Sequence, residues 1–285
     1  MHRLKRSFAL VLVLCLLCAA APAAHAAWQP PEPPQPLRLY YSGMLAGTAY
    51  VENGMLFLPL ENLCVFLGLP VQILGSETAG SYSAVGNNFL LSCEKGSHYT
   101  VANHRCLYSP EEYRFYEGEL YLPQNVMEKA FSLNAAISPD EDRVDVDIST
   151  FAVIRGGVDY YASTFSNDDL TWLSQIIYAE ARLEPLEGKI AVGNVVLNRV
   201  ASEKFPNSIY DVVFYTNNAW QFTPAQTGAI YTAPDEQSVA AACMCLEGAS
   251  VAGKCLYFMN PWAANTADFQ AYTLWGRIGN HNFYY

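Results

Sequence analysis

Three glutamates lie close together in the second half of the sequence, and carboxylates in such a pattern can transfer protons. Glu180 follows apolar residues with helical spacing, whereas Glu184 and Glu187 stand beside Pro185 and Gly188. A carboxylate on the apolar side of a helix loses solvent, which disfavours its charged form and raises its pKa. Such a group can donate a proton near neutral pH. The pattern therefore predicts that Glu180 is an acid in a functional site, while Glu184 and Glu187 fit a solvated helix end.

Helices must hold Glu180, and the sequence predicts four of them in this half. The first spans residues 168–182, with Ser166 or Asn167 as its cap. A second is expected at residues 186–200, a short third after Ser208, and a fourth at residues 234–246, ended by Gly248. Residues 256–258 fit a brief extended segment and residues 280–285 an aromatic tail. The predicted architecture of residues 166–285 is therefore mostly α-helical.

The first half contains an internal repeat. Residues 53–59 (NGMLFLP) are echoed by residues 117–123 (EGELYLP). In each copy a glycine turn precedes a short β segment, and a proline precedes a helix, expected at residues 60–67 and 124–131. Alternating segments at residues 89–93, 99–101 and 144–148 predict half-exposed strands. The sequence therefore predicts an α+β module of two similar halves at residues 37–149, joined to the second half by a linker at residues 150–165.

Residues 1–26 show the pattern of a secretory signal peptide. Basic residues at the start precede an apolar run from Phe8 to Leu17, and Ala24-His25-Ala26 fits a cleavage site. The run is shorter than the roughly 20 residues of a membrane span, so a retained anchor is the less favoured interpretation. A proline-rich linker is expected at residues 27–36. We predict a secreted or cell-envelope protein with no transmembrane segment in its mature form.

The charge balance excludes one class of partner. The chain has a net charge of −11, and loss of the three basic residues in the signal peptide would leave 13 basic against 27 acidic side chains. A chain this acidic is not expected to bind nucleic acid or another anionic polymer by bulk electrostatics. Aromatic residues make up 13% of the sequence, so recognition of a polymer would use ring stacking and hydrogen bonds.

Aromatic and amide side chains recur together downstream of Glu180. Rings stack on sugar faces while amides bond hydroxyl and N-acetyl groups, although aromatic residues more often form core. The candidate substrate-binding residues are Glu184, Asn198, Gln221, Phe222, Thr223, Tyr257, Asn260 and His281.

The motifs in this half resemble the catalytic domain of the SleB-type spore-cortex-lytic cell wall hydrolases. Two departures occur: Tyr178 stands where a histidine often precedes the Ala-Glu pair, and Leu183 replaces the usual glycine. The matching pieces are Ala179-Glu180-Ala181-Arg182, Glu184-Pro185, Glu187-Gly188, Ala191-Val192, Val195-Val196-Leu197-Asn198-Arg199-Val200, Phe205-Pro206-Asn207, Val212-Val213-Phe214, Gln221-Phe222-Thr223, Tyr257-Phe258 with Asn260-Pro261, and Ile278-Gly279 with His281 and Phe283.

This resemblance implies a compact, lysozyme-like or transglycosylase-like fold that cleaves peptidoglycan glycan strands, with Glu180 as its catalytic carboxylate. Ordinary glycosidases need a second carboxylate, whereas in a lytic transglycosylase the muramic acid C6 hydroxyl attacks C1 and leaves a 1,6-anhydro end. Glu184 lies on the same helix face as Glu180 and could be a second acid, but the following Pro185 favours a structural role at the helix end. The choice of product, and of spore cortex or vegetative wall as substrate, stays open.

Residues 37–149 resemble the copper amine oxidase N-terminal-like, or stalk, domains of exported proteins. The resemblance rests on the repeated Gly-x-Leu-aromatic-Leu-Pro followed by an amphipathic helix, and it implies scaffolding or attachment to wall or envelope proteins. His98 and His104 lack a plausible set of metal ligands. We predict neither a metal nor another cofactor.

Two other functions compete with hydrolysis of the glycan. The departures at Tyr178 and Leu183 allow a non-catalytic wall-binding or scaffold protein. A peptidase or amidase using a cysteine with His281 is disfavoured, because the available cysteines are not expected at a helix N-terminus that would lower a thiol pKa. Six cysteines lie outside the signal peptide, three in each half, so they cannot all pair within their own halves. We assign them no chemistry from sequence: Cys64, Cys93, Cys106, Cys243, Cys245 and Cys255.

Overall fold

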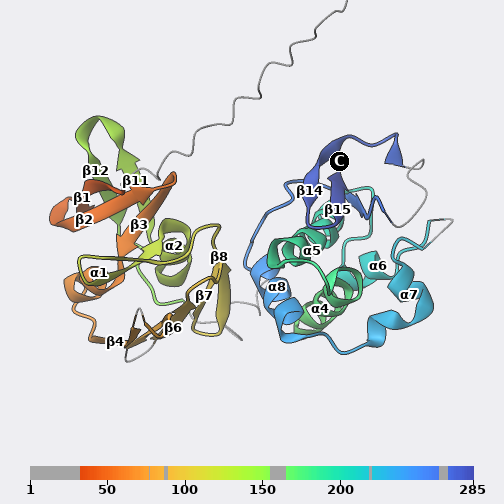
Figure 1. Ribbon diagram of the computed structural model, residues 1–285, viewed down its shortest axis with the longest axis horizontal. Coiled ribbons are helices and arrows are strands. Elements are labelled where there is room, and N and C mark those ends of the chain that lie inside the picture. The colour runs from red at the N-terminus through yellow and green to blue at the C-terminus, as the bar shows by residue number, and fades with distance from the viewer. Residues whose placement is uncertain (1–32, 77, 87–88, 155–164, 218–219, 263–268) are drawn as a thin grey trace, which may run out of the picture. The chain divides into compact units, whose positions relative to one another are not determined.

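A computed structural model describes residues 33–76, 78–86, 89–154, 165–217, 220–262 and 269–285. The predicted signal peptide, most of the proline-rich linker and most of the second linker lie outside these residues. Contacts group residues 34–285 into one unit, which is labelled by element in Figure 1. Its described residues form three sheets and two clusters of helices.

Seven strands of the first half form one sheet in the order β11-β12-β1-β2-β3-β10-β9. Within it β1 pairs with β12 in parallel, and the neighbouring pair β1 and β2 is antiparallel. The strands are β1 (Gln35–Tyr41), β2 (Met44–Glu52), β3 (Met55–Pro59), β9 (Arg114–Tyr116), β10 (Glu119–Pro123), β11 (Asn134–Ser138) and β12 (Arg143–Asp147), with a 3-10 turn at Pro139–Glu141.

The two copies of the sequence repeat lie next to each other in this sheet. β3 and β10 pair antiparallel, with Leu58 opposite Leu122. Each strand follows a turn with a glycine at positive φ, 76° at Gly54 and 91° at Gly118, where a side chain would be strained. Each strand then leads into a helix, α1 (Leu60–Phe66) or α2 (Gln124–Phe131). Both predicted helices are therefore confirmed.

A second, five-stranded antiparallel sheet completes the first half, in the order β4-β5-β6-β7-β8. The three strands predicted in the first half are present as β6, β7 and β12. One apolar core joins the two sheets and both helices, and it includes the fully buried Leu39, Leu58 and Phe131. The strands of the second sheet are β4 (Val71–Ser76), β5 (Ser81–Gly86), β6 (Phe89–Glu94), β7 (Tyr99–Ala102) and β8 (Arg105–Tyr108).

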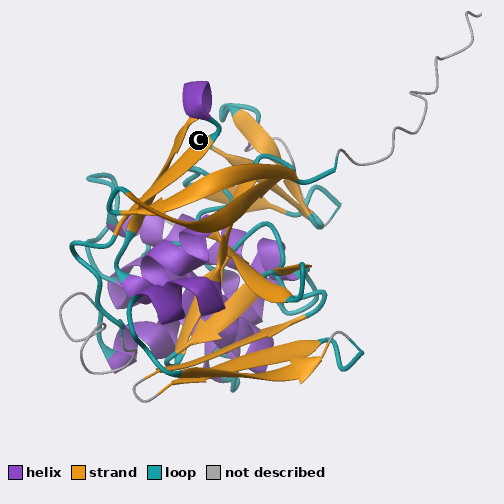
Figure 2. Ribbon diagram, turned by 90° about the vertical axis from the view of Figure 1, so that its left-hand side faces the viewer, coloured by secondary structure: helices purple, strands orange, loops and turns teal. Residues whose placement is uncertain are grey.

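Helices α4 (Asn167–Ala181), α5 (Leu186–Val200) and α8 (Glu236–Leu246) pack on one another in the second half (Figures 1 and 2). Ser166 caps α4 as predicted, since its hydroxyl accepts from Asp169 N while the Asp169 carboxylate accepts from Ser166 N. Gly193 permits the close approach of the three helices, because a Cβ there would lie 2.6 Å from Cys245 Sγ and 2.9 Å from Ile177 Cδ1. Shorter helices α6 (Ile209–Val213) and α7 (Thr223–Thr227) complete the cluster.

The prediction of a mostly α-helical second half is wrong. Strands β13 (Tyr257–Met259), β14 (Leu274–Ile278) and β15 (His281–Tyr284) form an antiparallel sheet in the order β13-β15-β14. Only a brief extended segment and an aromatic tail were expected there. The physical reason is a two-residue hairpin turn, Gly279-Asn280, between the paired residues Ile278 and His281. Gly279 has φ 57°, and glycine at the first loop position is typical of tight hairpins.

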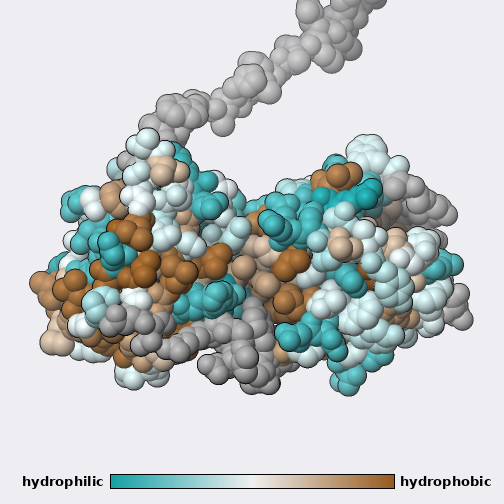
Figure 3. Space-filling view, turned by 90° about the horizontal axis from the view of Figure 1, so that it is seen from below, coloured by the Kyte–Doolittle hydropathy of each residue, from teal (hydrophilic) through white to brown (hydrophobic). Residues whose placement is uncertain are grey.

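Helix α8 also contacts the edge strand β8 of the first half. Arg105 on β8 forms a two-pronged ion pair with Glu247, at 2.9 Å from Nε and 2.8 Å from Nη2, and both side chains are 1% exposed. Covering an edge strand prevents its unpaired backbone groups from joining another chain. In the part of the chain that the structure describes, no helix is both long and apolar enough to cross a membrane. Hydrophobic side chains nevertheless reach the surface in several places, seen as brown patches in Figure 3.

Candidate active site

Glu180 lies in the last turn of α4 and is half-buried. Among the described residues its carboxylate has neither a salt bridge nor a side-chain hydrogen bond. Burial raises the pKa of Glu180 to about 7, and the positive charge of Arg199 opposes this shift without cancelling it. Glu180 is thus partly protonated at neutral pH, as a proton donor must be.

Arg199, on α5, is the charged group that faces Glu180. It is 4% exposed, and its Nε donates to the Leu256 carbonyl oxygen at 2.8 Å. Its Nη1 is buried and has no hydrogen-bond partner within the described residues. Burial lowers the pKa of Arg199 to about 10, opposed by the nearby Tyr257 and Glu180. The guanidinium therefore stays positive at neutral pH with one donor unused.

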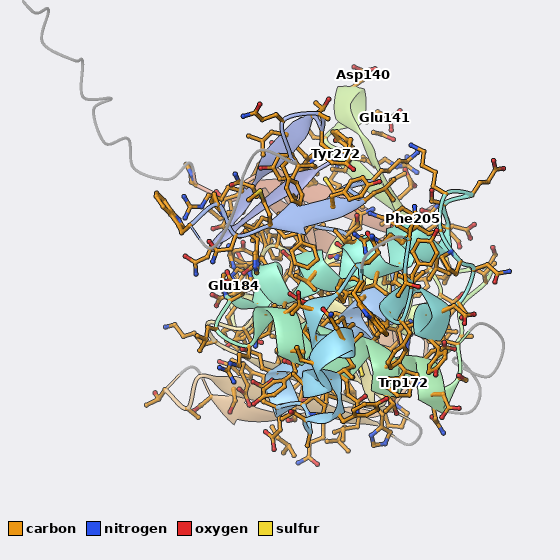
Figure 4. The ribbon with its side chains drawn as sticks, turned by 90° about the vertical axis from the view of Figure 1, so that its right-hand side faces the viewer. Asp140, Glu141, Trp172, Glu184, Phe205 and Tyr272 are labelled. Carbon is orange, nitrogen blue, oxygen red and sulfur yellow. The ribbon has the colours of Figure 1, made fainter. Side chains whose placement is uncertain are left out.

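Aromatic rings from three separate segments surround this guanidinium. Its carbon lies 4.9 Å from the ring centroids of Phe205 and Phe222 and 5.6 Å from that of Tyr257. Tyr257 lies in turn against Tyr272 in a tilted arrangement, with 4.2 Å between ring centroids, and Figure 4 labels Phe205 and Tyr272. Cation–π contacts of this kind can hold an arginine without an ion pair. The structure thus brings Glu180, Phe222 and Tyr257 together around Arg199.

A second cluster is built around Glu184, labelled in Figure 4. Its carboxylate accepts from Asn280 N at 2.8 Å and from Asn280 Nδ2 at 3.1 Å. A Cβ on Gly279 would lie 2.0 Å from Glu184 Oε2, so only glycine permits this approach. Glu184 is 8% exposed. Glu184 therefore links the β14–β15 turn to the N-terminal end of α5, which is a structural role.

His281 belongs to the same cluster. Its Nδ1 lies 4.0 Å from Glu184 Oε1 and its side chain is 8% exposed. Burial lowers the pKa of His281, and the Glu184 charge opposes that shift. The ring packs against Phe258 at 5.2 Å, and Phe258 reaches Phe222 at 6.3 Å between centroids. An aromatic contact therefore links this cluster to the rings around Arg199.

The remaining predicted residues divide between structural and accessible positions. Asn198 Nδ2 donates to the carbonyl oxygens of Gly253 and Cys255, both at 2.9 Å, which ties α5 to the loop before β13. Asn260 Oδ1 accepts from Trp262 N at 2.9 Å. Gln221 is half-buried and Thr223 is exposed.

The cysteine–histidine alternative finds no support in Cys245 or Cys255. Burial raises the pKa of Cys255 to about 11 and that of Cys245 further still, whereas a nucleophilic cysteine needs a lowered thiol pKa. Among the described residues no group of three or more His, Cys, Asp or Glu side chains could hold a metal ion.

Sequence reasoning missed two members of the site. In the sequence, Arg199 stands out only as part of a motif, and no pattern indicates that Tyr272 belongs to the site. Tyr272 precedes a strand that was itself not predicted, so nothing placed it opposite Tyr257. A guanidinium that closely follows the apolar residues Val195, Val196 and Leu197 is the pattern by which Arg199 could have been found.

Comparison with known proteins identifies the segment that carries most of these residues. Residues 183–284 match the model of the family described as Cell Wall Hydrolase, and the match begins three residues after Glu180. The spore cortex-lytic enzyme of Bacillus subtilis (strain 168) is 38% identical over 124 residues, which are 42% of this chain and 38% of the relative. The spore cortex-lytic enzyme of Halalkalibacterium halodurans is 35% identical over 119 residues, 42% of this chain and 35% of the relative.

The chain thus spans well under half the length of these curated relatives. Among solved structures, the catalytic domain of the germination-specific lytic transglycosylase SleB from Bacillus anthracis is 33% identical, with a TM-score of 0.40, over 43% of this chain and 98% of that one. The C-terminal part of this chain therefore matches the Cell Wall Hydrolase family model and is similar in sequence to spore cortex-lytic enzymes.

Proposed function

We propose that this chain cleaves the glycan strand of peptidoglycan, with Glu180 as the general acid. The observation that carries the proposal is a half-buried carboxylate that has no ion pair among the described residues and lies near a buried arginine surrounded by aromatic rings, where burial raises its pKa to about 7. The sequence similarity to spore cortex-lytic enzymes supports peptidoglycan as the substrate class. Spore cortex is the form of peptidoglycan that the names of the relatives favour.

The proposed reaction begins with proton transfer from Glu180 to the glycosidic oxygen. The bond from C1 to that oxygen breaks as an oxocarbenium-like centre develops at C1, and the leaving sugar departs as an alcohol. The Glu180 carboxylate then removes a proton from the nucleophile that attacks C1. Arg199 steadies the negative charge that Glu180 carries between the two steps.

The hydrogen bonds that Glu184 accepts favour a particular nucleophile for the attack on C1. A water nucleophile requires a second carboxylate, yet both oxygens of Glu184 accept hydrogen bonds from Asn280. The muramic acid C6 hydroxyl needs only the one carboxylate that has just lost its proton. We therefore propose lytic transglycosylation, with a 1,6-anhydro product, rather than hydrolysis.

Substrate contacts are proposed for the accessible members of the predicted set. Tyr257 and Gln221 are half-buried and Thr223 is exposed, so a ring, an amide and a hydroxyl are available to a sugar. Phe222 is 2% exposed, so we assign it to packing beneath Arg199 instead. Three residues are proposed to act indirectly, by holding in place the turn and the loop that they contact: Glu184, Asn198 and His281. Asn260 is proposed to hold the start of the loop at Trp262 in the same way.

We also propose a role for the first half of the chain and a cellular location for the protein. Residues 37–149 are proposed to be a stalk-like scaffold that attaches the enzyme to wall or envelope proteins, by their resemblance to copper amine oxidase N-terminal-like domains. Residues 1–26 are proposed to direct export, which would place the enzyme in the cell envelope where peptidoglycan lies.

The test compares Glu180→Gln with Glu187→Gln, a half-buried acid at the start of α5. Release of soluble glycan from purified cortex and vegetative wall is measured, and products are identified by mass spectrometry. Glu180→Gln should lose roughly 10³-fold in rate, within the range for a general acid, while Glu187→Gln keeps its rate. Full activity of Glu180→Gln would remove this residue from the mechanism, and wall binding without any chain cleavage by the parent would indicate a scaffold protein.

A further inference from the structure

Two cysteines from different halves of the chain meet where β8 contacts α8. Cys106 on β8 and Cys243 on α8 are both half-buried, and a hydrogen bond joins their side chains. Neither residue belongs to the site around Glu180. Cys106 also packs, with Tyr99 and Tyr108, against the apolar core of the second half.

Charged groups beside the two sulfurs hold the strand and the helix together. Glu247 lies four residues after Cys243, immediately after the last residue of α8, and Arg105 precedes Cys106 on β8. The Arg105–Glu247 ion pair is bidentate, and Lys129 Nζ donates to the Glu247 carbonyl oxygen at 2.7 Å. The approach of the two sulfurs is therefore fixed by a buried framework that does not involve them.

Other cysteines are arranged differently. Cys245 Sγ donates to the Ile190 carbonyl oxygen at 3.4 Å, and Cys93 Sγ faces the Tyr82 carbonyl oxygen at 3.9 Å. Cys64 and Cys255 are buried in separate cores. Outside the predicted signal peptide each half contains three cysteines, an odd number that cannot all pair within the half. Cys106 and Cys243 are the cysteines, one from each half, that lie opposite each other.

We propose that Cys106 and Cys243 form a disulfide that links β8 to α8 when the chain meets a disulfide donor. One thiolate attacks the donor disulfide, which forms a mixed disulfide and releases one reduced donor thiol. The second protein thiolate then attacks the mixed disulfide, the intramolecular bond forms, and the other donor thiol leaves. Two protein thiols are oxidised and one donor disulfide is reduced to two thiols, so electrons and protons balance.

The bond would restrain the helix on which the site is built. α8 packs against both α4, which carries Glu180, and α5, which carries Arg199. A link from residue 106 to residue 243 closes a long loop, and constraint of the unfolded chain grows with loop length. The oxidised protein should unfold at a higher temperature than the reduced protein, and a reductant should reverse the change.

The test treats the reduced full chain with oxidised glutathione, followed by tryptic digestion without reductant. The hydrogen bond to Cys243 and burial raise the pKa of Cys106, so mildly alkaline buffer should speed the exchange. Mass spectrometry should find residues 106–114 linked to residues 205–254. Cys245→Ala is the matched control, because Cys245 lies in the same tryptic peptide as Cys243; it should keep the link, whereas Cys243→Ser and Cys106→Ser should each abolish it.

Thermal unfolding gives a second readout on the same samples. Oxidation should raise the midpoint in the parent and in Cys245→Ala, but leave it unchanged in Cys243→Ser. Glutathione adducts without the linked peptide, or a link that persists in Cys243→Ser, would overturn the proposal. These outcomes do not depend on any catalytic activity, so they are separate from the fate of the proposed function.

Discussion

Within the described residues, two arginine–glutamate pairs are shielded from solvent, and they are built in opposite ways. Arg105 and Glu247, where β8 meets α8, contact each other through two hydrogen bonds of 2.8 and 2.9 Å, with both side chains 1% exposed. Arg199 and Glu180, in the candidate site, influence each other's pKa without an ion pair. Three aromatic rings take the place of the carboxylate around Arg199.

We propose that this difference separates a structural pair from a reactive one. Contact with a guanidinium stabilises the charged form of a carboxylate, so the acid loses its proton and its use as a donor. When aromatic rings keep the guanidinium out of contact with the carboxylate, burial has a larger effect on the carboxyl pKa than the positive charge has. The carboxyl then stays protonated to a higher pH. Under this proposal the same two residue types serve stability in one place and proton transfer in the other, and four changes can break or sharpen the contrast.

The largest effect is expected from breaking the structural pair. Arg105→Ala leaves Glu247 buried without its partner, which should lower the free energy of unfolding by about 3–5 kcal/mol. Urea denaturation measures this loss. Arg114→Ala is the control, because Arg114 contacts Glu52 and Glu111 but is 22% exposed, and a loss of only about 1 kcal/mol is expected there. Equal losses at both sites would remove the distinction between buried and accessible pairs.

Removing the charge of Glu180 is expected to have the opposite effect on the stability of the fold. Burial raises the pKa of Glu180 from 4.5 to about 7, so ionising Glu180 destabilises the fold as pH rises through this range. Glu180→Gln should therefore be more stable than the parent by an amount that grows between these pH values and then stays constant, reaching about 3 kcal/mol. Denaturation curves at pH 4.5 and 8 measure it. A variant that is less stable than the parent at pH 8 would contradict the account.

The turn beside Glu184 offers a matched pair of glycines. Gly279→Ala puts a Cβ against Glu184 at positive φ, whereas a Cβ on Gly276 meets nothing within 4 Å. We expect Gly279→Ala to cost about 1–3 kcal/mol of stability, and to lower activity by moving the β14–β15 turn. Gly276→Ala should change both by much less. Glycan release and thermal unfolding of the two variants give the comparison, and identical behaviour would mean that the turn does not position the site.

The smallest effect concerns the pH dependence of the rate. Arg199 lowers the pKa of Glu180 against the larger effect of burial. Arg199→Met should therefore raise that pKa and move the alkaline limb of the kcat/KM profile to higher pH, although packing losses reduce the rate itself. A limb that moves to lower pH, or that stays in place, would show that the Arg199 charge does not act on Glu180.

Local patterns predicted much of the fold and suggested one member of the candidate site. The repeat at Gly54 and Gly118 predicted both helices of the first half, since a turn, a strand and a helix start are encoded within a few residues. Glu180 could be proposed from the sequence because its apolar helical context is also local. The β14–β15 hairpin is missed although Gly279-Asn280 is a two-residue turn signal, because residues 280–285 are interpreted only as an aromatic tail.

The rest of the site depends on contacts between distant parts of the chain. The role of Glu184 is set by Asn280, 96 residues later, and its neighbour Pro185 indicated only a helix end. Arg199 gains its place from rings on the segments of Phe205, Phe222 and Tyr257, and no spacing in the sequence fixes their approach. Packing therefore decides which of several acids keeps its proton.

The most direct test of this account is the carboxyl pKa of Glu180 itself. A carbon-13 NMR titration of the protein with labelled glutamate, with the Glu180 signal assigned by its disappearance in Glu180→Gln, measures it in the folded chain. The account predicts a midpoint of about 7. A midpoint near the ordinary 4.5 would mean that Glu180 is ionised at neutral pH, and it would contradict the proposed role of this residue as the proton donor.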